Sequence, residues 1–275
     1  MTPMNMCTRL ALALVAALTV AGQAAAQDRP IFDAHIHYSQ GDWSTIPPER
    51  ALAILKEAGI RRALVSSTPD DGTMKLYEKA PDVVVPMLRP YRTRADMSTW
   101  TRDSAVQAYV EDRLKRGVHR GIGEFHMSAG DADAPVVRRF AELSAERGLV
   151  LQAHVDAAAI ERLATLYPKA RFLWAHAGFA GGEVVGDIMD RFPNVWAELA
   201  LNSSVTSGGK LDPAWARLFT RKPDRFLVGT DTWVTSRWDS VVPGMRDYRA
   251  WLSELPADVA DQIAWKNGDR LFGSR

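Results

Sequence analysis

Two histidines in this sequence are spaced so that both could bind one metal ion. His35 and His37 come directly after the short run at 31–34 and form a His-x-His pair. Residues two apart on a strand point to the same face, so the two imidazoles can aim at one point. A divalent metal ion needs such convergence. The pair indicates a metal site, although one His-x-His is by itself a weak motif.

Four later apolar runs also end in side chains that commonly bind metals. These side chains are Glu124, His126, His154, His176 and Asp231. A polar group at the end of a buried strand needs a partner, and a metal ion can provide one. The sequence therefore predicts a metal centre built from several strands.

The same runs belong to a regular alternation of strand-like and helix-like segments. We predict strands at 31–37, 63–67, 83–88, 121–126, 150–154, 172–176, 195–199 and 226–231. Continuous apolar runs of this kind suit parallel strands buried on both faces, and apolar residues recur at helical spacing between them. Eight such units favour an α/β fold of the TIM type, a closed (β/α)8 barrel with its active site at the C-terminal rim. The sixth histidine, His119, precedes the fourth strand, so we expect it in solvent at the opposite end.

The N-terminal segment has the pattern of a secretory signal peptide. Residues 1–26 contain Arg9, an apolar stretch at 10–21 and small residues at 24–26. The apolar stretch is shorter than the roughly 20 residues needed to span a bilayer. We expect cleavage, no membrane anchor afterwards, and a single barrel domain at 27–275 that is periplasmic or secreted.

Charge and cysteine content narrow the range of partners. Arg9 is the only charged residue of the predicted signal peptide, so its removal leaves 33 Lys+Arg (34 − 1) against 33 Asp+Glu. This balance does not favour nucleic-acid binding, which calls for a basic surplus. Cys7, the only cysteine, precedes the cleavage point, so the mature chain has no disulfide. We expect a small-molecule substrate, and a homo-oligomer is compatible with the sequence.

As a set, the metal-binding residue types at these strand ends resemble the pattern of the amidohydrolase superfamily. Members carry His-x-His on strand one, an acid or lysine on strand four, histidines on strands five and six, and aspartate on strand eight. The flanking segments at 32–37, 174–178 and 267–272 are most similar to the amidohydrolase-related branch. The resemblance spans nearly the whole mature chain, and its motifs are specific as a set and weak singly.

The resemblance implies two metal ions and a role for each of these residues. One metal would be bound by His35, His37 and Asp231, a more exposed one by His154 and His176, and Glu124 would bridge them. A hydroxide shared by the metals would be the nucleophile. Asp231 would take its proton and pass it to the leaving group. The implied reaction is hydrolysis of an ester, lactone, amide or related bond of a small molecule.

Two other functions and several metals stay open at this point. Related branches use one metal, and in some of them the strand-six histidine donates a proton, so a decarboxylase with His176 as the acid is one alternative. A non-catalytic metal- or ligand-binding barrel is the other. Zinc suits histidine and carboxylate ligands, as do manganese, iron, cobalt and nickel.

Substrate contacts are expected close to the predicted rim. Arg89, Arg92 and Arg94 follow the third strand, where guanidinium groups could hold a carboxylate or phosphate. His126 and Trp233 lie beside predicted ligands. We expect substrate contacts from Arg89, Arg92, His126 and Trp233, the alternatives being an exposed cationic loop and core packing.

Overall fold

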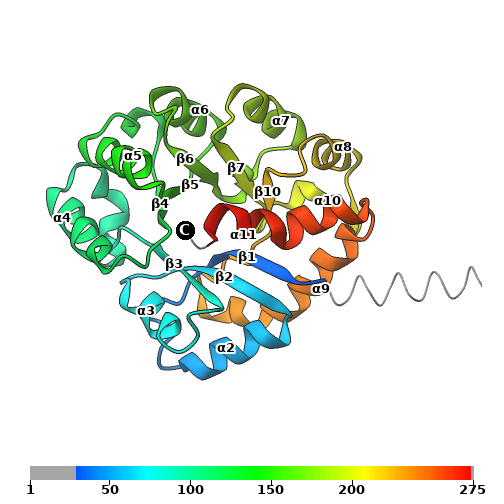
Figure 1. Ribbon diagram of the computed structural model, residues 1–275, viewed down its shortest axis with the longest axis horizontal. Helices are drawn as coiled ribbons and strands as arrows, with labels where there is room; N and C mark the ends of the chain where they lie inside the picture. Colours follow the sequence, from blue (N-terminus) through cyan, green and yellow to red (C-terminus); the bar gives the residue numbers. More distant parts are fainter. Residues whose placement is uncertain (1–28, 274–275) are drawn as a thin grey trace, which may run out of the picture.

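Eight parallel strands form a barrel surrounded by helices in the computed structural model (Figure 1). The structure describes residues 29–273, so the predicted signal peptide at 1–26 lies outside the described residues. The strands are β1 (Ile31–Ile36), β2 (Ile60–Ser66), β3 (Val84–Leu88), β4 (Gly121–His126), β5 (Val150–His154), β6 (Arg171–Trp174), β7 (Val195–Glu198) and β10 (Phe226–Leu227). They neighbour one another in chain order, which confirms the TIM-type barrel.

The first and last strands meet through the main chain. The Ala34 amide donates a hydrogen bond to the Val228 carbonyl at 2.9 Å, and the Asp231 amide donates to the His35 carbonyl at 2.7 Å. These two bonds close the sheet and bring Asp231 next to β1.

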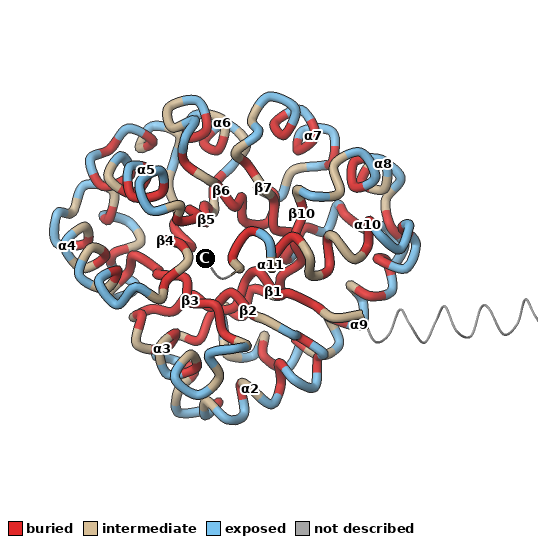
Figure 2. The backbone as a smooth tube through the Cα atoms, viewed as in Figure 1, coloured by how far each residue is buried: buried red, intermediate tan, exposed pale blue. Residues whose placement is uncertain are grey.

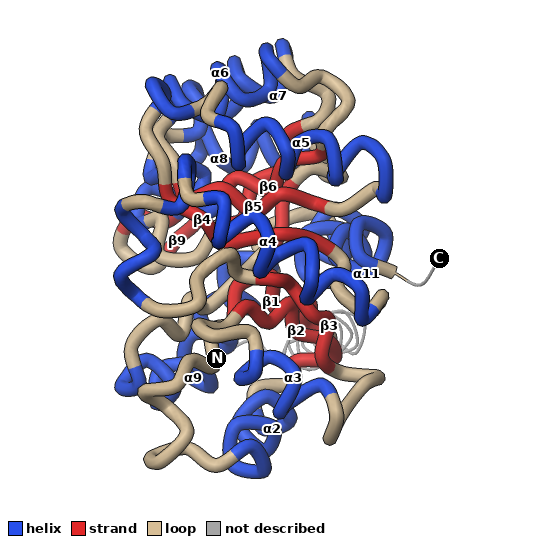
Figure 3. Tube along the Cα trace, turned by 90° about the vertical axis from the view of Figure 1, so that its left-hand side faces the viewer, coloured by secondary structure: helices blue, strands red, loops and turns tan. Residues whose placement is uncertain are grey.

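Helices cover the outside of the barrel, and seen from the side the strands lie between them (Figure 3). The helices are α2 (Pro48–Glu57), α3 (Asp71–Tyr77), α4 (Ser104–Arg113), α5 (Pro135–Arg147), α6 (Ala157–Leu166), α7 (Gly182–Arg191), α8 (Pro213–Arg221), α9 (Val241–Leu252), α10 (Ala257–Asp261) and α11 (Asn267–Phe272). A small hairpin of β8 (Thr206–Ser207) and β9 (Lys210–Leu211) lies outside the barrel sheet. Within residues 29–273, no helix has the length and apolar character that crossing a membrane requires.

The start of α8 shows how local sequence sets these helices. The Asp212 carboxylate accepts hydrogen bonds from the amides of Ala214 and Trp215, at 2.8 and 3.2 Å. Pro213 occupies the first turn, where its missing N–H costs nothing.

Buried residues lie on the strands and on the sides of the helices that face them (Figure 2).

Helix α11 closes the N-terminal end of the barrel. Leu271 and Phe272 join a cluster of barrel residues that includes Phe32, and the two phenyl rings stack with centroids 5.8 Å apart. A Cβ on Gly268 would lie 2.2 Å from the Phe32 ring, so only glycine allows this approach. The closing motif at 267–272 therefore blocks one end of the barrel, and the opposite rim is left for chemistry.

Two predicted strands end two or more residues earlier than expected. The sequence predicted that His176 and Asp231 would end β6 and β10, but these strands end at Trp174 and Leu227. His176 has φ 57° and Asp231 has φ 50°, values outside the range of a strand. Both side chains therefore come from turns at the rim, and such backbone strain is concentrated at functional sites.

Candidate metal centre

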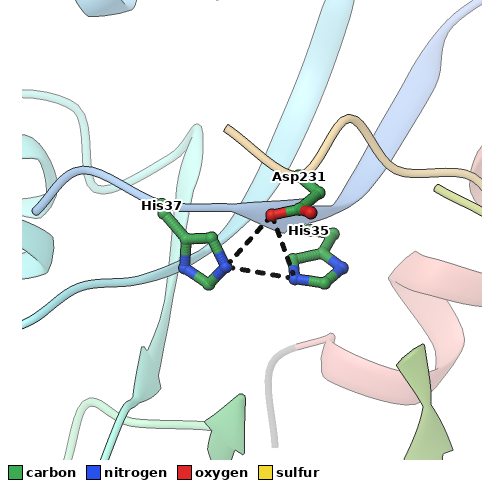
Figure 4. A group of neighbouring side chains, drawn as sticks. All are labelled: His35, His37 and Asp231. Carbon is green, nitrogen blue, oxygen red and sulfur yellow. Dashed lines mark hydrogen bonds and ion pairs between the residues drawn. The ribbon is translucent and has the colours of Figure 1, made fainter. Parts of the chain in front are cut away.

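Three imidazoles and a carboxylate converge at the C-terminal rim. His35 Nε2 and His37 Nε2 lie 3.2 Å apart, and the His176 ring stacks beside His35 with centroids 4.9 Å apart. Asp231 Oδ1 is 3.4 Å from His37 Nε2 and 3.8 Å from His35 Nε2 (Figure 4). These atoms meet at one point although they come from three separate strand ends.

The other nitrogen of each ring is already held. The contacts are His35 Nδ1 to Glu198 Oε2 at 2.8 Å, His37 Nδ1 to the Ser66 carbonyl at 2.7 Å, and His176 Nδ1 to the Ala200 carbonyl at 2.7 Å. Metal-binding histidines typically donate the second N–H to a carboxylate or carbonyl, which directs the Nε2 lone pair at the metal. His176 Nε2 is buried and has no hydrogen-bond partner among the described residues. Three imidazoles are thus oriented as ligands.

Glu124 lies at the centre of the cluster. Its Oε1 is 3.4 Å from His35 Nε2 and 2.8 Å from His154 Nδ1, and its Oε2 is 3.3 Å from His37 Nε2. Arg89 Nη2 donates to the same Oε2 at 2.9 Å. Burial opposes ionisation, but His35 and the neighbouring histidines hold the pKa of the Glu124 carboxyl well below its usual range. The carboxylate is therefore ionised and in contact with several imidazoles.

The electrostatics of the cluster fit a bound cation. Burial lowers the pKa of His35, yet Glu124 and Glu198 raise it overall well above its usual value. The same carboxylates that stabilise a proton there would stabilise a divalent metal ion. The donor set of imidazole nitrogens and carboxylate oxygens is one that zinc and similar metals accept.

The structure groups the predicted ligands, together with His126, into three overlapping sets. The sets are His35, His37 and Asp231; His35, Glu124 and His176; and Glu124, His126 and His154. The family resemblance implied one metal for His154 and His176 together. The His154 and His176 ring centroids lie 4.6 Å apart, and the three sets group His176 with His35 and His154 with His126. Glu124 belongs to two sets, which is the position that a bridging ligand would occupy.

His126 and His154 form the more exposed side of the cluster. Their ring centroids are 4.4 Å apart, and the Tyr91 hydroxyl lies 3.2 Å from His126 Nδ1. Burial lowers the pKa of His126 to about 4. A neutral ring at this position can serve as a ligand or as a contact for a substrate.

The arginines predicted to contact substrate have other partners in the structure. Arg89 is fully buried against Glu124. Arg92 Nη2 pairs with Asp96 Oδ1 and Asp103 Oδ2, each at 2.8 Å. Trp233 meets the His37 ring edge-on, with centroids 5.7 Å apart. Trp233 and Arg92 both line a cavity beside the metal centre.

The expectation that His119 lies in solvent is wrong. His119 is buried, and its Nε2 lies 3.0 Å from Asp70 Oδ1. The carboxylate of Asp70 is itself fully buried and needs polar partners, which His119 and Arg116 supply. This histidine therefore has a structural environment of its own, apart from the metal centre.

Two residues of the site were not found from the sequence. Glu198 contacts His35 Nδ1 and accepts a hydrogen bond from the His176 amide at 3.2 Å. As an acid that ends a strand, it carried the same signal as Glu124. Arg237 Nη1 lies 2.6 Å from Asp231 Oδ2, a contact that nothing in the sequence indicated.

Comparison with known proteins identifies the family. A family model described as amidohydrolase matches residues 32–274, so the chain belongs to the amidohydrolase family. It is a metal-dependent hydrolase of the amidohydrolase type, with candidate ligands in place at the barrel rim. No curated protein matches the chain.

Solved structures share the fold at low sequence identity. An amidohydrolase from Burkholderia multivorans with bound zinc is 13% identical, covers 89% of this chain and 99% of its own, and has a TM-score of 0.60. A probable 2-pyrone-4,6-dicarboxylic acid hydrolase from Acinetobacter baumannii, with citric acid bound, is 12% identical with the same coverage and a TM-score of 0.60. A TatD homolog from Escherichia coli is 14% identical, covers 91% of this chain and 100% of its own, and has a TM-score of 0.62. At these identities the likeness shows the fold.

Proposed function

We propose that the protein hydrolyses an ester, lactone, amide or related bond of a small molecule, using a divalent metal held at the rim. The main support is the convergence of the Nε2 atoms of three buried imidazole rings, each of which is already hydrogen-bonded through Nδ1. His35, His37 and Asp231 would hold one ion, with His176 and Glu124 beside it. The zinc in the Burkholderia structure supports zinc as that ion.

A bound divalent metal would lower the pKa of a water molecule and polarise the bond to be cleaved. The protein itself supplies the proton acceptor. Burial opposes ionisation of Asp231, but His35 and His37 hold the pKa of its carboxyl below the usual range. Asp231 is therefore ionised at neutral pH and can take a proton from the attacking water, then give it to the leaving group.

Other residues fix the groups that react. Arg237 binds Asp231 Oδ2, which leaves Oδ1 directed toward the histidines. Arg89 donates hydrogen bonds to the side-chain Oε2 of Glu124 at 2.9 Å and to the main-chain carbonyl of Glu124 at 3.2 Å. These contacts keep the two carboxylates in place before substrate arrives, which is how preorganised sites lower a barrier.

The test is hydrolysis by purified protein of a panel of esters, lactones and amides before and after chelation. We expect turnover of at least one class, loss on chelation, and recovery with zinc, manganese or cobalt. His35→Ala should be inactive, while Val184→Ala, an exposed site on α7, should be unaffected. Hydrolysis that survives chelation would contradict the proposal, and carbon dioxide release from an acid without hydrolysis would establish the decarboxylase instead.

We also propose that this chemistry takes place in the periplasm or outside the cell. The support is the sequence pattern of residues 1–26 alone. N-terminal sequencing of the protein from fractionated cells tests it. A mature chain that begins at Gln27 in the exported fraction is expected, and an uncleaved cytoplasmic chain would contradict the proposal.

A further inference from the structure

A cavity of about 560 Å³ lies between the loops that follow β1, β2, β3 and β10. Trp233 forms part of its lining and also meets the His37 ring edge-on, at 5.7 Å between centroids. Trp233 therefore connects the lining of the cavity to the metal centre.

Two guanidinium groups lie over that ring. The Cζ of Arg89 is 4.4 Å from the Trp233 centroid, and the Cζ of Arg94 is 4.8 Å from it. Arg89 is buried and uses two of its nitrogens on Glu124, while its Nη1 has no hydrogen-bond partner among the described residues. Arg94 lines the cavity and is exposed, and its side chain makes no ion pair or hydrogen bond with any residue of 29–273.

The other charged groups of the cavity lining are already matched. Arg92 is held by Asp96 and Asp103. Asp42 accepts from the Ser39 amide at 2.8 Å and from the Thr235 hydroxyl at 2.6 Å. Arg94 is therefore the charged group of the lining that still lacks a hydrogen-bonding partner.

We propose that Arg94 binds a carboxylate or phosphate group of the substrate, so that the substrate is a small organic anion seated in this cavity. A guanidinium binds either anion through two parallel hydrogen bonds. The arrangement would hold the anionic end in the cavity and present the rest of the molecule to the histidines. This inference deepens the proposed hydrolysis and rests on it for the reaction, but the binding step can be measured alone.

Isothermal titration calorimetry of the metal-loaded protein with benzoate, phenyl phosphate and benzamide tests this binding. Benzoate and benzamide share a ring and differ in charge, and phenyl phosphate distinguishes the two anions. We expect at least one anion to bind about tenfold or more tighter than benzamide. The Arg94→Gln substitution should weaken the binding of that anion about tenfold and leave the affinity for benzamide unchanged.

Arg102→Gln is the matched control. Arg102 is exposed and lies outside the cavity lining, and among the described residues its side chain has only a 3.7 Å contact, with Asp131. Its variant should bind every probe as the wild type does. Circular dichroism checks that both variants fold.

Three results would overturn the proposal. Equal affinity for the anions and benzamide would remove the charge preference, and no detectable anion binding at tens of millimolar would remove the site. Unchanged anion affinity in Arg94→Gln would place the anion elsewhere, for example on the metal. Because no turnover is measured, a failed hydrolysis panel with intact anion preference would count against the hydrolase proposal alone.

Discussion

His35 shows how single residues define this site. Its Nε2 faces Glu124 and Asp231, while its Nδ1 contacts Glu198. Burying carboxylates costs free energy unless they are paired, and here the shared partners are imidazoles. Such a cluster is most stable when a cation occupies it, so metal binding and stability should be coupled.

Asp231→Asn tests the proton-transfer role of this carboxylate. The amide keeps the size of the side chain but cannot accept and return a proton, so we expect kcat to fall about 10²- to 10⁴-fold. The variant should still fold, which circular dichroism checks. Steady-state kinetics on whichever panel substrate is cleaved gives the answer, and activity close to wild type would show that another group moves the proton.

Glu198→Gln tests the support behind His35. Removing the carboxylate next to Nδ1 should weaken metal binding about 10- to 100-fold, as found for such supporting contacts. Competition with a chromophoric chelator measures the affinity. Glu183→Gln, at an exposed position on α7, is the matched control and should bind metal normally. An unchanged affinity in Glu198→Gln would mean that the contact does not orient His35.

The sequence predicted which side chains meet but not how each ring is held. Strand ends of a closed barrel share one rim, so His35, His154 and Asp231 could be expected together. Which imidazole nitrogen faces the centre depends on contacts such as that of His37 with the Ser66 carbonyl. Those partners are distant in the chain, and no local pattern encodes them.

Among the structural elements, the turns after the strands carry the departures from regular geometry. The turn after β6 holds His176, Ala177 and Phe179 at positive φ, and Phe179 is 53% exposed while it stacks on the His176 ring at 4.6 Å. Apolar periodicity predicted β6 itself, but it carries no information on this turn. The strand cores were therefore predictable, and the turns that aim the ligands were not.

The loop after β3 offers a prediction on pH. Asp96 accepts hydrogen bonds from the Arg92 side chain and from two amides, and the Arg92 contact holds the pKa of the Asp96 carboxyl below its usual value. A lowered folded-state pKa stabilises the protein above the unfolded pKa, near 4, and this contribution is lost as pH falls further. Asp96→Asn should therefore lower the unfolding free energy by about 1–2 kcal/mol at pH 7, and by less below pH ~4.

Urea unfolding at several pH values measures this difference. Asp82→Asn is the control, because Asp82 is exposed and makes no ion pair or hydrogen bond with the described residues. A gap between Asp96→Asn and wild type that stays constant from pH 7 to about 3 would contradict the ionic origin of the effect.

For the whole molecule, the two ends of the barrel have separate tasks. Helix α11 fills the N-terminal end with Leu271 and Phe272, while charged and aromatic groups line the other. The strand pattern predicted the active site at the C-terminal rim, but it did not predict that residues 267–272 fill the other end. The contact of that motif with Phe32 joins segments at opposite ends of the chain, which local patterns do not reveal.

Phe272→Ala tests the closure of the barrel. Deleting a buried phenyl ring leaves a cavity, so we expect the unfolding free energy to fall by about 3–5 kcal/mol. Val184→Ala, at a 45% exposed position, should change it by less than about 0.5 kcal/mol. Denaturant unfolding compares the two, and similar stabilities would mean that α11 contributes little to the fold.

The most direct test of the metal centre is the metal content per chain, by elemental analysis, of wild type, His35→Ala and His119→Ala. His119 is a buried histidine outside the cluster, so it controls for the loss of an imidazole. We predict one or two equivalents in wild type and His119→Ala, and a clear loss in His35→Ala. Metal-free wild type after growth with supplied zinc, or equal content in all three proteins, would contradict it.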